Sequence, residues 1–318
     1  MRQPYQIAES LSSFVGQTHV VGRLSVEISA AQRRGTMPGP ILIRGEAGLG
    51  KTELAKRIAG ELHAPLVMKH CPSMAPGQRG QELFWAIAEQ KEPFVLFCDE
   101  IHALIERELE PSYTAINEGV LIAQGKRIRV PAFTLIGATT RAGRLPTPFK
   151  SRLDTDLLLL PYNVHEIEKI MAIHGDELSI PYPRPSIEGG AIGFLASRAW
   201  GNPRAGRKLL AAAYRWAVAR DLDTLDAGGA SAYCELAGID NNGLTVMDRE
   251  YLLILASSPK RTAGIETVAA ALGLTPADIE NDIEPRLLRG DTYGRYIQRT
   301  GRGRLLLERG REAIGVPS

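Results

Sequence analysis

The sequence predicts an α/β domain with a parallel sheet, followed by a small helical domain and a winged-helix domain. Three observations predict this order. A glycine-rich segment near residue 45 separates an apolar run from an amphipathic stretch, a buried-strand pattern ends in two carboxylates near residue 100, and a basic segment alternates like a hairpin near residue 300. We expect the three domains to comprise residues 1–162, 163–242 and 243–318.

The composition is that of a globular protein, with 44% hydrophobic and 23% charged residues over 318 positions. No apolar run approaches membrane-spanning length, and the N-terminal segment "MRQPYQIAES" lacks the apolar core of a signal peptide. Cys71, Cys98 and Cys234 are far apart and form no C-x-x-C pair, so neither a disulfide framework nor a zinc site is predicted. We therefore expect a cytoplasmic protein that does not associate with a membrane.

The segment "GEAGLGKT", residues 45–52, matches the phosphate-binding pattern G-x-x-x-x-G-K-[ST]. Residues 40–44 before it form an apolar run of strand length, and residues 53–62 after it carry apolar side chains at helical spacing. Glycines let successive N–H groups point at an anion, and a helix start favours negative charge. The alternative is a turn that merely connects strand and helix. The candidate nucleotide-binding residues are Gly45, Gly48, Gly50, Lys51 and Thr52, with Lys51 on the terminal phosphates and the Thr52 hydroxyl on Mg²⁺.

A second buried-strand pattern, residues 94–98, delivers Asp99 and Glu100 at its carboxyl end. Ligands of open α/β sheets bind at the carboxyl ends of strands. We expect Asp99 to bind Mg²⁺, directly or through water, and Glu100 to orient and deprotonate the attacking water. The alternative is that both residues cap the next helix, but the phosphate loop earlier in the chain favours catalysis.

A third buried-strand pattern, residues 132–141, ends in polar residues that include Thr140. A hydroxyl at this strand end, beside the terminal phosphate, is placed to position the attacking water. Judged locally, the threonines equally fit the start of an ordinary loop.

Residues 163–242 are expected to form a small helical domain. Asn163 and Glu166 form a capping box that opens a helix, and three further helical segments follow before about residue 240. Asn202 is a good N-cap and Pro203 a good first helical residue. Arg204 then lies in the first turn, where a cation opposes the helix dipole. This favours an arginine that faces a phosphate over a solvated surface arginine.

The region from residue 243 is expected to form a winged helix that binds DNA. Two helical segments precede a third helix, which a capping box opens at Thr275–Asp278, and residues 292–307 alternate around a Gly-Arg-Gly turn. Net charge is only +2, yet eight arginines between residues 286 and 311 oppose two acidic residues. Arg299, Arg302 and Arg304 on the hairpin are the candidate phosphate contacts. The alternative is a solvated hairpin.

The phosphate loop, "DEIH", "GATTRAG" and "PFKSR", in this order, resemble the motifs of AAA+ ATPases. Together with "FVGQ", "MDREYLL" and "QRTGRGR", they resemble more narrowly the RuvB family, ring motors of Holliday-junction branch migration. The resemblance implies ATP as the nucleotide, a homo-oligomer expected to be a hexameric ring, and duplex or four-way-junction DNA as a partner. It implies that Thr140 is the polar sensor, Arg152 the arginine finger on a neighbouring subunit's nucleotide and Arg204 the second sensor. It further implies that Tyr162 lies near the adenine and that Arg299 and Arg304 contact DNA.

The most consequential departure from this family lies between residues 121 and 133. RuvB proteins carry a long hairpin that docks on their partner RuvA, and the matching stretch, residues 121–133, is several residues shorter here. We therefore do not expect a standard RuvA partnership. A motor that moves along DNA and an ATP-switched loader or recombination regulator both remain open. The complete set of Lys51, Thr52, Asp99 and Glu100 argues against a winged-helix regulator with a vestigial ATPase.

Overall fold

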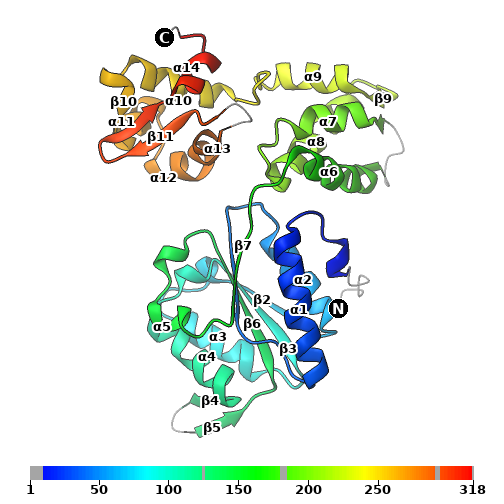
Figure 1. Cartoon of the computed structure of the whole chain (residues 1–318), viewed down its shortest axis with the longest axis vertical. Helices are drawn as coiled ribbons and strands as arrows, with labels where there is room; N and C mark the ends of the chain where they lie inside the picture. The colour runs from blue at the N-terminus through cyan, green and yellow to red at the C-terminus, as the bar shows by residue number, and fades with distance from the viewer. Residues whose placement is uncertain (1–9, 124–125, 180–184, 291–293, 317–318) are drawn as a thin grey trace. The chain divides into compact units, whose positions relative to one another are not determined.

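Five parallel strands form the sheet of the first unit, in the order β2–β3–β6–β1–β7 (Figure 1). The computed structural model describes residues 10–123, 126–179, 185–290 and 294–316. The strands are β1 (Ile41–Arg44), β2 (Leu66–His70), β3 (Phe94–Asp99), β6 (Phe133–Thr139) and β7 (Thr155–Leu158). The three strands expected from apolar runs are β1, β3 and β6, and the predicted α/β fold is confirmed.

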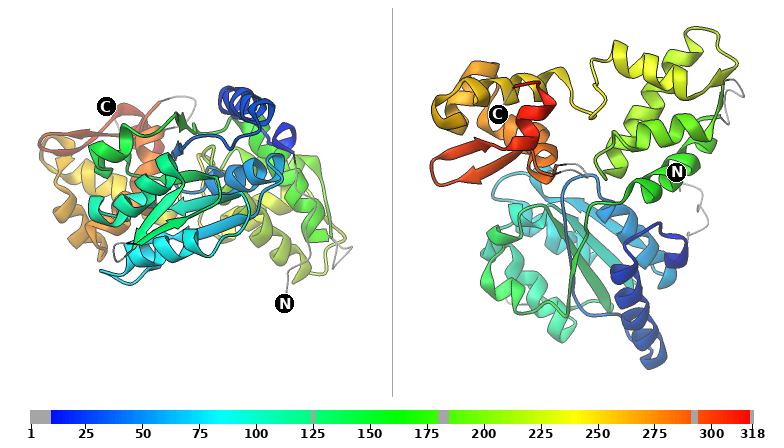
Figure 2. Two further views of the ribbon diagram at one scale, coloured as in Figure 1. Left: turned by 90° about the horizontal axis from the view of Figure 1, so that it is seen from below. Right: turned by 45° about the horizontal axis from the view of Figure 1, so that its top comes forward.

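Helices cover both faces of this sheet (Figures 1 and 2). They are α1 (Thr18–Arg34), α2 (Lys51–Glu61), α3 (Arg79–Ala88), α4 (Glu106–Glu118) and the short α5 (Thr147–Lys150). Leu83 of α3 and Leu109 of α4 belong to the same buried apolar cluster as Leu96 and Leu135 of the sheet. Because the central strands are covered on both faces, they read in the sequence as continuous apolar runs.

An antiparallel hairpin, β4 (Val120–Ala123) and β5 (Lys126–Arg129), follows α4. Each strand has four residues, and the exposed Ile122 lies opposite Arg127 across the pair. This is the stretch in which the sequence predicts a missing RuvA-docking tip. Residues 124–125 between the strands lie outside the described residues.

The second unit begins with four helices, α6 (Val164–Ser179), α7 (Gly189–Ala196), α8 (Pro203–Val218) and α9 (Ala227–Leu236). The predicted capping box is present, because the Glu166 N–H donates to Asn163 Oδ1 and the Asn163 N–H to Glu166 Oε2, both at 2.9 Å. Two short strands, β8 (Ser186–Ile187) and β9 (Thr224–Leu225), pair in parallel and were not predicted, because two residues give no periodicity.

The winged helix contains α10 (Val246–Ser257), α11 (Ile265–Leu272), α12 (Pro276–Asp278), α13 (Glu284–Arg289) and α14 (Glu308–Ala313). Its sheet has the order β10 (Thr262–Ala263), β12 (Gly303–Leu306), β11 (Ile297–Thr300). β11 and β12 are the predicted hairpin, and Tyr251 and Tyr296 are fully buried in the core beside it. Residues 291–293, at the start of the segment predicted to contain the hairpin, lie outside the described residues.

The predicted third helix of the winged helix is not a single α-helix. Its capping box forms as expected, with the Thr275 hydroxyl 2.7 Å from Asp278 Oδ2. A π-helical turn over Ile279–Ile283 then separates α12 from α13. The physical reason is Pro285, which has no N–H to donate and whose ring excludes the carbonyl of the preceding turn. The wider turn accommodates the proline.

The chain forms two compact units, residues 1–162 and 163–318. The finer division into three domains stays a prediction. Within the described ranges, the structure contains no helix long and apolar enough to cross a membrane.

Candidate functional site

The glycine-rich loop joins the end of β1 to the start of α2. Gly45 has φ +152° and Gly50 has φ +95°, backbone conformations that residues with a side chain rarely adopt. A Cβ at Gly45 would lie 3.1 Å from both the Cβ and the carbonyl oxygen of Leu159. Gly48, between them, also has positive φ. The glycines are therefore required by the path of the loop itself.

Lys51, the first residue of α2, is only 6% exposed. Its Nζ donates to the carbonyl oxygens of Gly45 and Glu46, at 2.8 and 2.9 Å, so the ammonium group lies inside the curve of the loop. A pocket of about 340 Å³ opens beside it, lined by Gly45, Glu46, Thr139 and Thr140 among others. A buried cation inside a glycine cradle at a helix start fits a bound phosphate chain.

Tyr162 packs against the same loop. Its hydroxyl donates to the carbonyl of Leu49 at 3.1 Å, and a Cβ on Gly50 would lie 3.5 Å from this hydroxyl. The Gln17 side-chain amide makes two hydrogen bonds to the backbone of Leu160. Its Nε2 donates to the Leu160 carbonyl at 2.5 Å, and its Oε1 accepts the Leu160 N–H at 3.0 Å. The sequence assigned no role to Gln17, although it lies in the "FVGQ" segment. The adenine contact of Tyr162 stays a prediction.

Asp99 ends β3, as predicted, and its Oδ1 accepts the N–H of Glu100 at 3.1 Å. Thr52 follows Lys51 in the first turn of α2. Among the described residues no group of three or more His, Cys, Asp and Glu side chains could hold a metal ion. One hydroxyl and one carboxylate nevertheless fit Mg²⁺, which commonly takes its other ligands from water and substrate phosphates.

Glu100 is held by the strand end that carries the predicted sensor. Its Oε2 accepts hydrogen bonds from the backbone N–H and the hydroxyl of Thr140, at 3.1 and 2.9 Å. Its backbone is in the left-handed region, with φ 49° and ψ 48°, which is strained for a residue with a side chain. The structure thus brings together two residues that the sequence singled out separately.

His102 is a further residue of this cluster, and the sequence assigned it no role. Its Nδ1 lies 3.1 Å from Glu100 Oε2 and 2.9 Å from the hydroxyl of Thr139. Burial lowers the pKa of its imidazole, and the negative charge of Glu100 opposes this shift. The only available signal was its place in "DEIH", since the contact with Thr139 joins residues 37 positions apart.

Arg152 lies away from the phosphate loop of its own chain. β7 is parallel to β1, with Thr155 opposite Ile41, and Asp154 donates its N–H to the carbonyl of Pro40 at 3.0 Å. Arg152 precedes this pairing and therefore lies at the amino ends of the strands. The loop follows the carboxyl end of β1, about 13 Å further along the strand direction at about 3.3 Å per residue.

Arg204 is exposed in the first turn of α8, as predicted. Asn202 caps this helix by accepting the N–H of Ala205 at 3.2 Å, and Pro203 is its first residue. The helix start is therefore built as the sequence indicated. The role of Arg204 as a nucleotide sensor stays a prediction.

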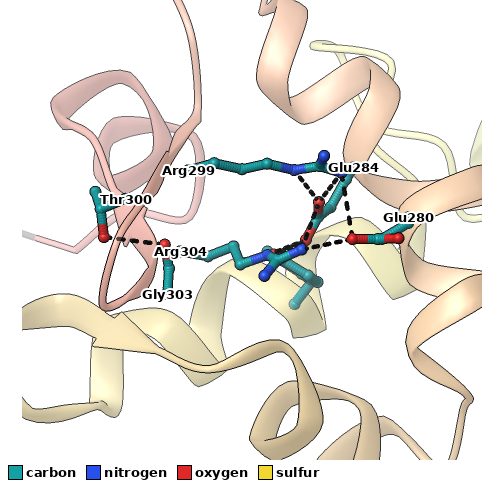
Figure 3. Close-up of polar contacts among 7 residues, drawn as sticks. Glu280, Glu284, Arg299, Thr300, Gly303 and Arg304 are labelled. Atoms are coloured by element: carbon teal, nitrogen blue, oxygen red, sulfur yellow. Dashed lines mark hydrogen bonds and ion pairs between the residues drawn. The ribbon is translucent and has the colours of Figure 1, made fainter. Parts of the chain in front are cut away.

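Two of the three candidate DNA-binding arginines are held by a buried carboxylate (Figure 3). Glu284 of α13 is fully buried and accepts from Arg299 Nε at 2.8 Å and from Arg304 Nε at 2.7 Å. Tyr251 also donates its hydroxyl to Glu284, at 3.0 Å, and Glu280 pairs with Arg304 at 3.0 Å. We call Glu284, Glu280, Tyr251, Arg299 and Arg304 the Glu284 cluster.

The Glu284 cluster was not foreseen from the sequence, in which Arg299 and Arg304 were assigned to DNA alone. The side chain of Arg304 is only 13% exposed, whereas that of Arg299 is 48% exposed. Burial favours a raised pKa for the Glu284 carboxyl, but its hydrogen bonds to Arg304 and Arg299 outweigh burial and lower the pKa. Arg302, in the turn between the strands, is exposed, and its side chain has no partner among the residues that the structure describes.

The similarity to known proteins covers both units. Residues 7–159 match the family model of the Holliday junction DNA helicase RuvB P-loop domain, and residues 241–315 match that of the RuvB C-terminal winged helix domain. A RuvB subunit of the Holliday junction branch migration complex from Rubrobacter xylanophilus is 34% identical over 324 residues, which cover 99% of this chain and 88% of the relative. The corresponding subunit from Campylobacter hominis is 32% identical over 315 residues, covering 96% and 89%. The solved structure of the Thermotoga maritima RuvB Holliday junction branch migration motor aligns over 98% of this chain and 99% of its own, with TM-score 0.83 and 30% identity. This chain therefore belongs to the RuvB family.

Proposed function

We propose that this chain is an ATP-hydrolysing, ring-forming DNA motor that acts in Holliday-junction branch migration. The observation that carries the proposal is the joint placement of the loop residues, Glu100 and Thr140 at one end of the sheet, with Arg152 at the other end. Such a chain has a nucleotide pocket whose arginine must come from elsewhere. A second copy of the same chain supplies it if the subunits form a closed ring.

Nucleotide binding is assigned to the loop and its neighbours. The backbone N–H groups of the glycine loop and the Lys51 ammonium bind the phosphates of ATP, and Thr52 and Asp99 would hold Mg²⁺. When bound, Mg²⁺ supplies positive charge that offsets the charge developing on the phosphoryl oxygens. Leu160, whose backbone Gln17 holds, lines the pocket together with Pro161. These residues and the adjacent Tyr162 are proposed to form the adenine side of the pocket.

Hydrolysis is assigned to Glu100 as the base that orients and deprotonates water. The Glu100 carboxylate already accepts two hydrogen bonds from Thr140 through Oε2, while Oε1 has no hydrogen-bond partner among the described residues. Thr140 therefore orients the carboxylate, and Oε1 is the atom available to take the proton. Arg152 of a neighbouring subunit stabilises the charge of the transition state. Arg204 is proposed to report the state of the nucleotide to the second unit.

DNA binding is assigned to the β11–β12 hairpin. Arg302 at its turn is the proposed direct phosphate contact, since it is exposed and makes no ion pair with a described residue. Arg299, half exposed and fixed by Glu284 through Nε and Nη2, can present its remaining edge to a phosphate. Arg304 is proposed to support the hairpin, with only a small direct contribution. We also propose that the motor acts without the standard RuvA contact, because the β4–β5 strands have only four residues each.

The test is ATPase activity with no DNA, with duplex DNA and with a four-way junction, measured alongside branch migration of the same junction in the absence of RuvA. The proposal expects ATPase stimulation by DNA and branch migration that Glu100→Gln abolishes. Stimulation and ATP-dependent DNA binding without branch migration would instead identify an ATP-switched loader. No ATPase activity under any condition would contradict the proposal.

A further inference from the structure

The guanidinium group of Arg152 rests on an aromatic ring. Its Cζ lies 4.4 Å from the ring centroid of Tyr113, a residue of α4, and its Nη1 donates to the carbonyl of Pro148 at 2.6 Å. Nε and Nη2 of Arg152 have no hydrogen-bond partner among the described residues. The Tyr113 ring thus covers one face of the guanidinium and the Pro148 carbonyl occupies Nη1, while Nε and Nη2 remain available to donate to a phosphate.

Tyr113 contributes its ring to this contact and not its hydroxyl. The residue is 7% exposed, and its ring stacks on Phe149 of α5 at 6.4 Å between centroids, with an interplanar angle of 26°. Its hydroxyl is buried and has no hydrogen-bond partner in the part of the chain that the structure describes. A buried hydroxyl without a partner destabilises the folded state, so this position is not explained by hydrogen bonding. The two things that the ring provides are packing against Phe149 and a π face beneath Arg152.

We propose that Tyr113 is the positioning residue of the arginine finger. This inference rests on the proposed role of Arg152 in a neighbouring subunit's active site. A free arginine side chain samples many rotamers, and ordering it is costly. The ring of Tyr113 lies on a thirteen-residue helix and the Pro148 carbonyl on the adjacent short helix, so both supports belong to the packed body of the subunit. They hold the guanidinium in one orientation before the neighbouring nucleotide arrives, which lowers the entropic cost of each catalytic encounter.

The test compares Tyr113→Phe, which keeps the ring, with Tyr113→Leu and Tyr113→Met, which keep an apolar side chain without a π face. We expect Tyr113→Leu and Tyr113→Met to reduce kcat for ATP by about threefold to thirtyfold, the range that a cation–π contact of ordinary strength allows. ATP affinity, measured with a fluorescent nucleotide, should be unchanged, because the pocket of the same chain is intact. Tyr113→Phe should retain the wild-type kcat and resist heat at least as well as the wild type.

A mixing experiment separates positioning from local damage. Subunits of Tyr113→Leu retain an intact nucleotide pocket, and subunits of Lys51→Ala retain a correctly positioned Arg152. Sites that combine the two should be active, so mixed oligomers should hydrolyse more ATP than the two variants measured separately. A purely structural defect in Tyr113→Leu would show no such gain. Wild-type kcat in both Tyr113→Leu and Tyr113→Met would also overturn the inference, and one of these variants is sufficient if the other does not fold.

Arg152→Ala distinguishes failure of this inference from failure of the proposed function. If Arg152→Ala is inactive while the Tyr113 variants are fully active, only the positioning role falls. If Arg152→Ala itself keeps wild-type turnover, Arg152 is not an arginine finger, and Tyr113 then has no finger to position. If Arg152→Ala and the Tyr113 variants all lose activity, and Lys51→Ala subunits rescue them, the finger role of Arg152 and the positioning role of Tyr113 are both supported.

Discussion

Replacing Arg304 and replacing Arg302 by alanine should have opposite consequences, although both are arginines of the same hairpin. Arg304 donates to Glu284 at 2.7 and 3.4 Å and to Glu280 at 3.0 Å, and Glu284 is fully buried. Removing one partner of a buried ion pair typically costs about 3–5 kcal/mol. Glu284 would keep Arg299 and the Tyr251 hydroxyl, so we expect a loss of about 2–3 kcal/mol in the free energy of unfolding.

Arg302→Ala removes an exposed side chain that makes no hydrogen bond or ion pair with a described residue, so the free energy of unfolding should change by about 0.5 kcal/mol or less. It should nevertheless weaken binding to all DNA sequences alike and reduce the slope of log affinity against log salt by about one unit. The assay pairs urea unfolding followed by circular dichroism with DNA affinity measured at several salt concentrations. In folded Arg304→Ala protein the salt slope should change much less than in Arg302→Ala.

Two outcomes would refute this reasoning. Loss of a full unit of salt slope in Arg304→Ala, with unchanged stability, would mean that Arg304 contacts phosphate and that the buried carboxylate does not depend on it. An unchanged salt slope in Arg302→Ala would mean that the exposed arginine of the turn is merely solvated. A triple alanine variant of Arg299, Arg302 and Arg304 could not separate these effects, because it would mix unfolding of the hairpin with the loss of phosphate contacts.

Three further predictions concern the nucleotide site, the subunit arrangement and acid stability. Lys51→Ala should abolish ATP binding, whereas Glu100→Gln should bind ATP and lose at least about a hundredfold in turnover; equal turnover in Glu100→Gln and wild type would disprove the base assignment. Arg152→Ala should bind ATP with a loss of turnover on the order of a thousandfold, and subunits of Lys51→Ala should restore part of it; absence of rescue in oligomers shown to be mixed would count against action in trans. Because the folded-state pKa of Glu284 is lowered, its stabilisation is present above the unfolded pKa of about 4.3 and is lost as pH falls below it. Urea unfolding should therefore show a steeper decline in stability below about pH 4.3 in the wild type than in Glu284→Gln, and identical declines would contradict this origin.

Local sequence signals predicted the parts of this protein that depend on short stretches of chain. The loop glycines, the strand that ends in Asp99 and the caps at Asn163 and Asn202 all follow from residues within a few positions of one another. In each case, the chemistry of the residue dictates the backbone around it. The same holds for the hairpin strands β11 and β12, which the sequence places on either side of a Gly-Arg-Gly turn and in which Gly303 has φ +131°.

Contacts between distant residues could not be predicted in this way. Glu284 joins Tyr251, 33 positions away, and Arg152 stacks on a ring of α4 that no motif marks. His102 was visible in a motif, but its partner Thr139 lies on another strand. Pro285 was also visible, but a proline is compatible with a kink, a break or a wider helical turn, and the local sequence does not distinguish among them. Such features depend on tertiary packing, which periodicity and spacing do not encode.

The left-handed backbone of Glu100 sets stability against the presence of a carboxylate at this position. A residue with a side chain pays roughly 1–2 kcal/mol to adopt this conformation, whereas glycine adopts it freely and asparagine more readily than most. Substituting either one would relieve the strain and remove the carboxylate that accepts both hydrogen bonds from Thr140. Under the proposed role of Glu100 as the catalytic base, selection for heat resistance alone would therefore favour a variant without turnover at this site. Glutamate at this position then reflects a balance in which turnover outweighs the local gain in stability.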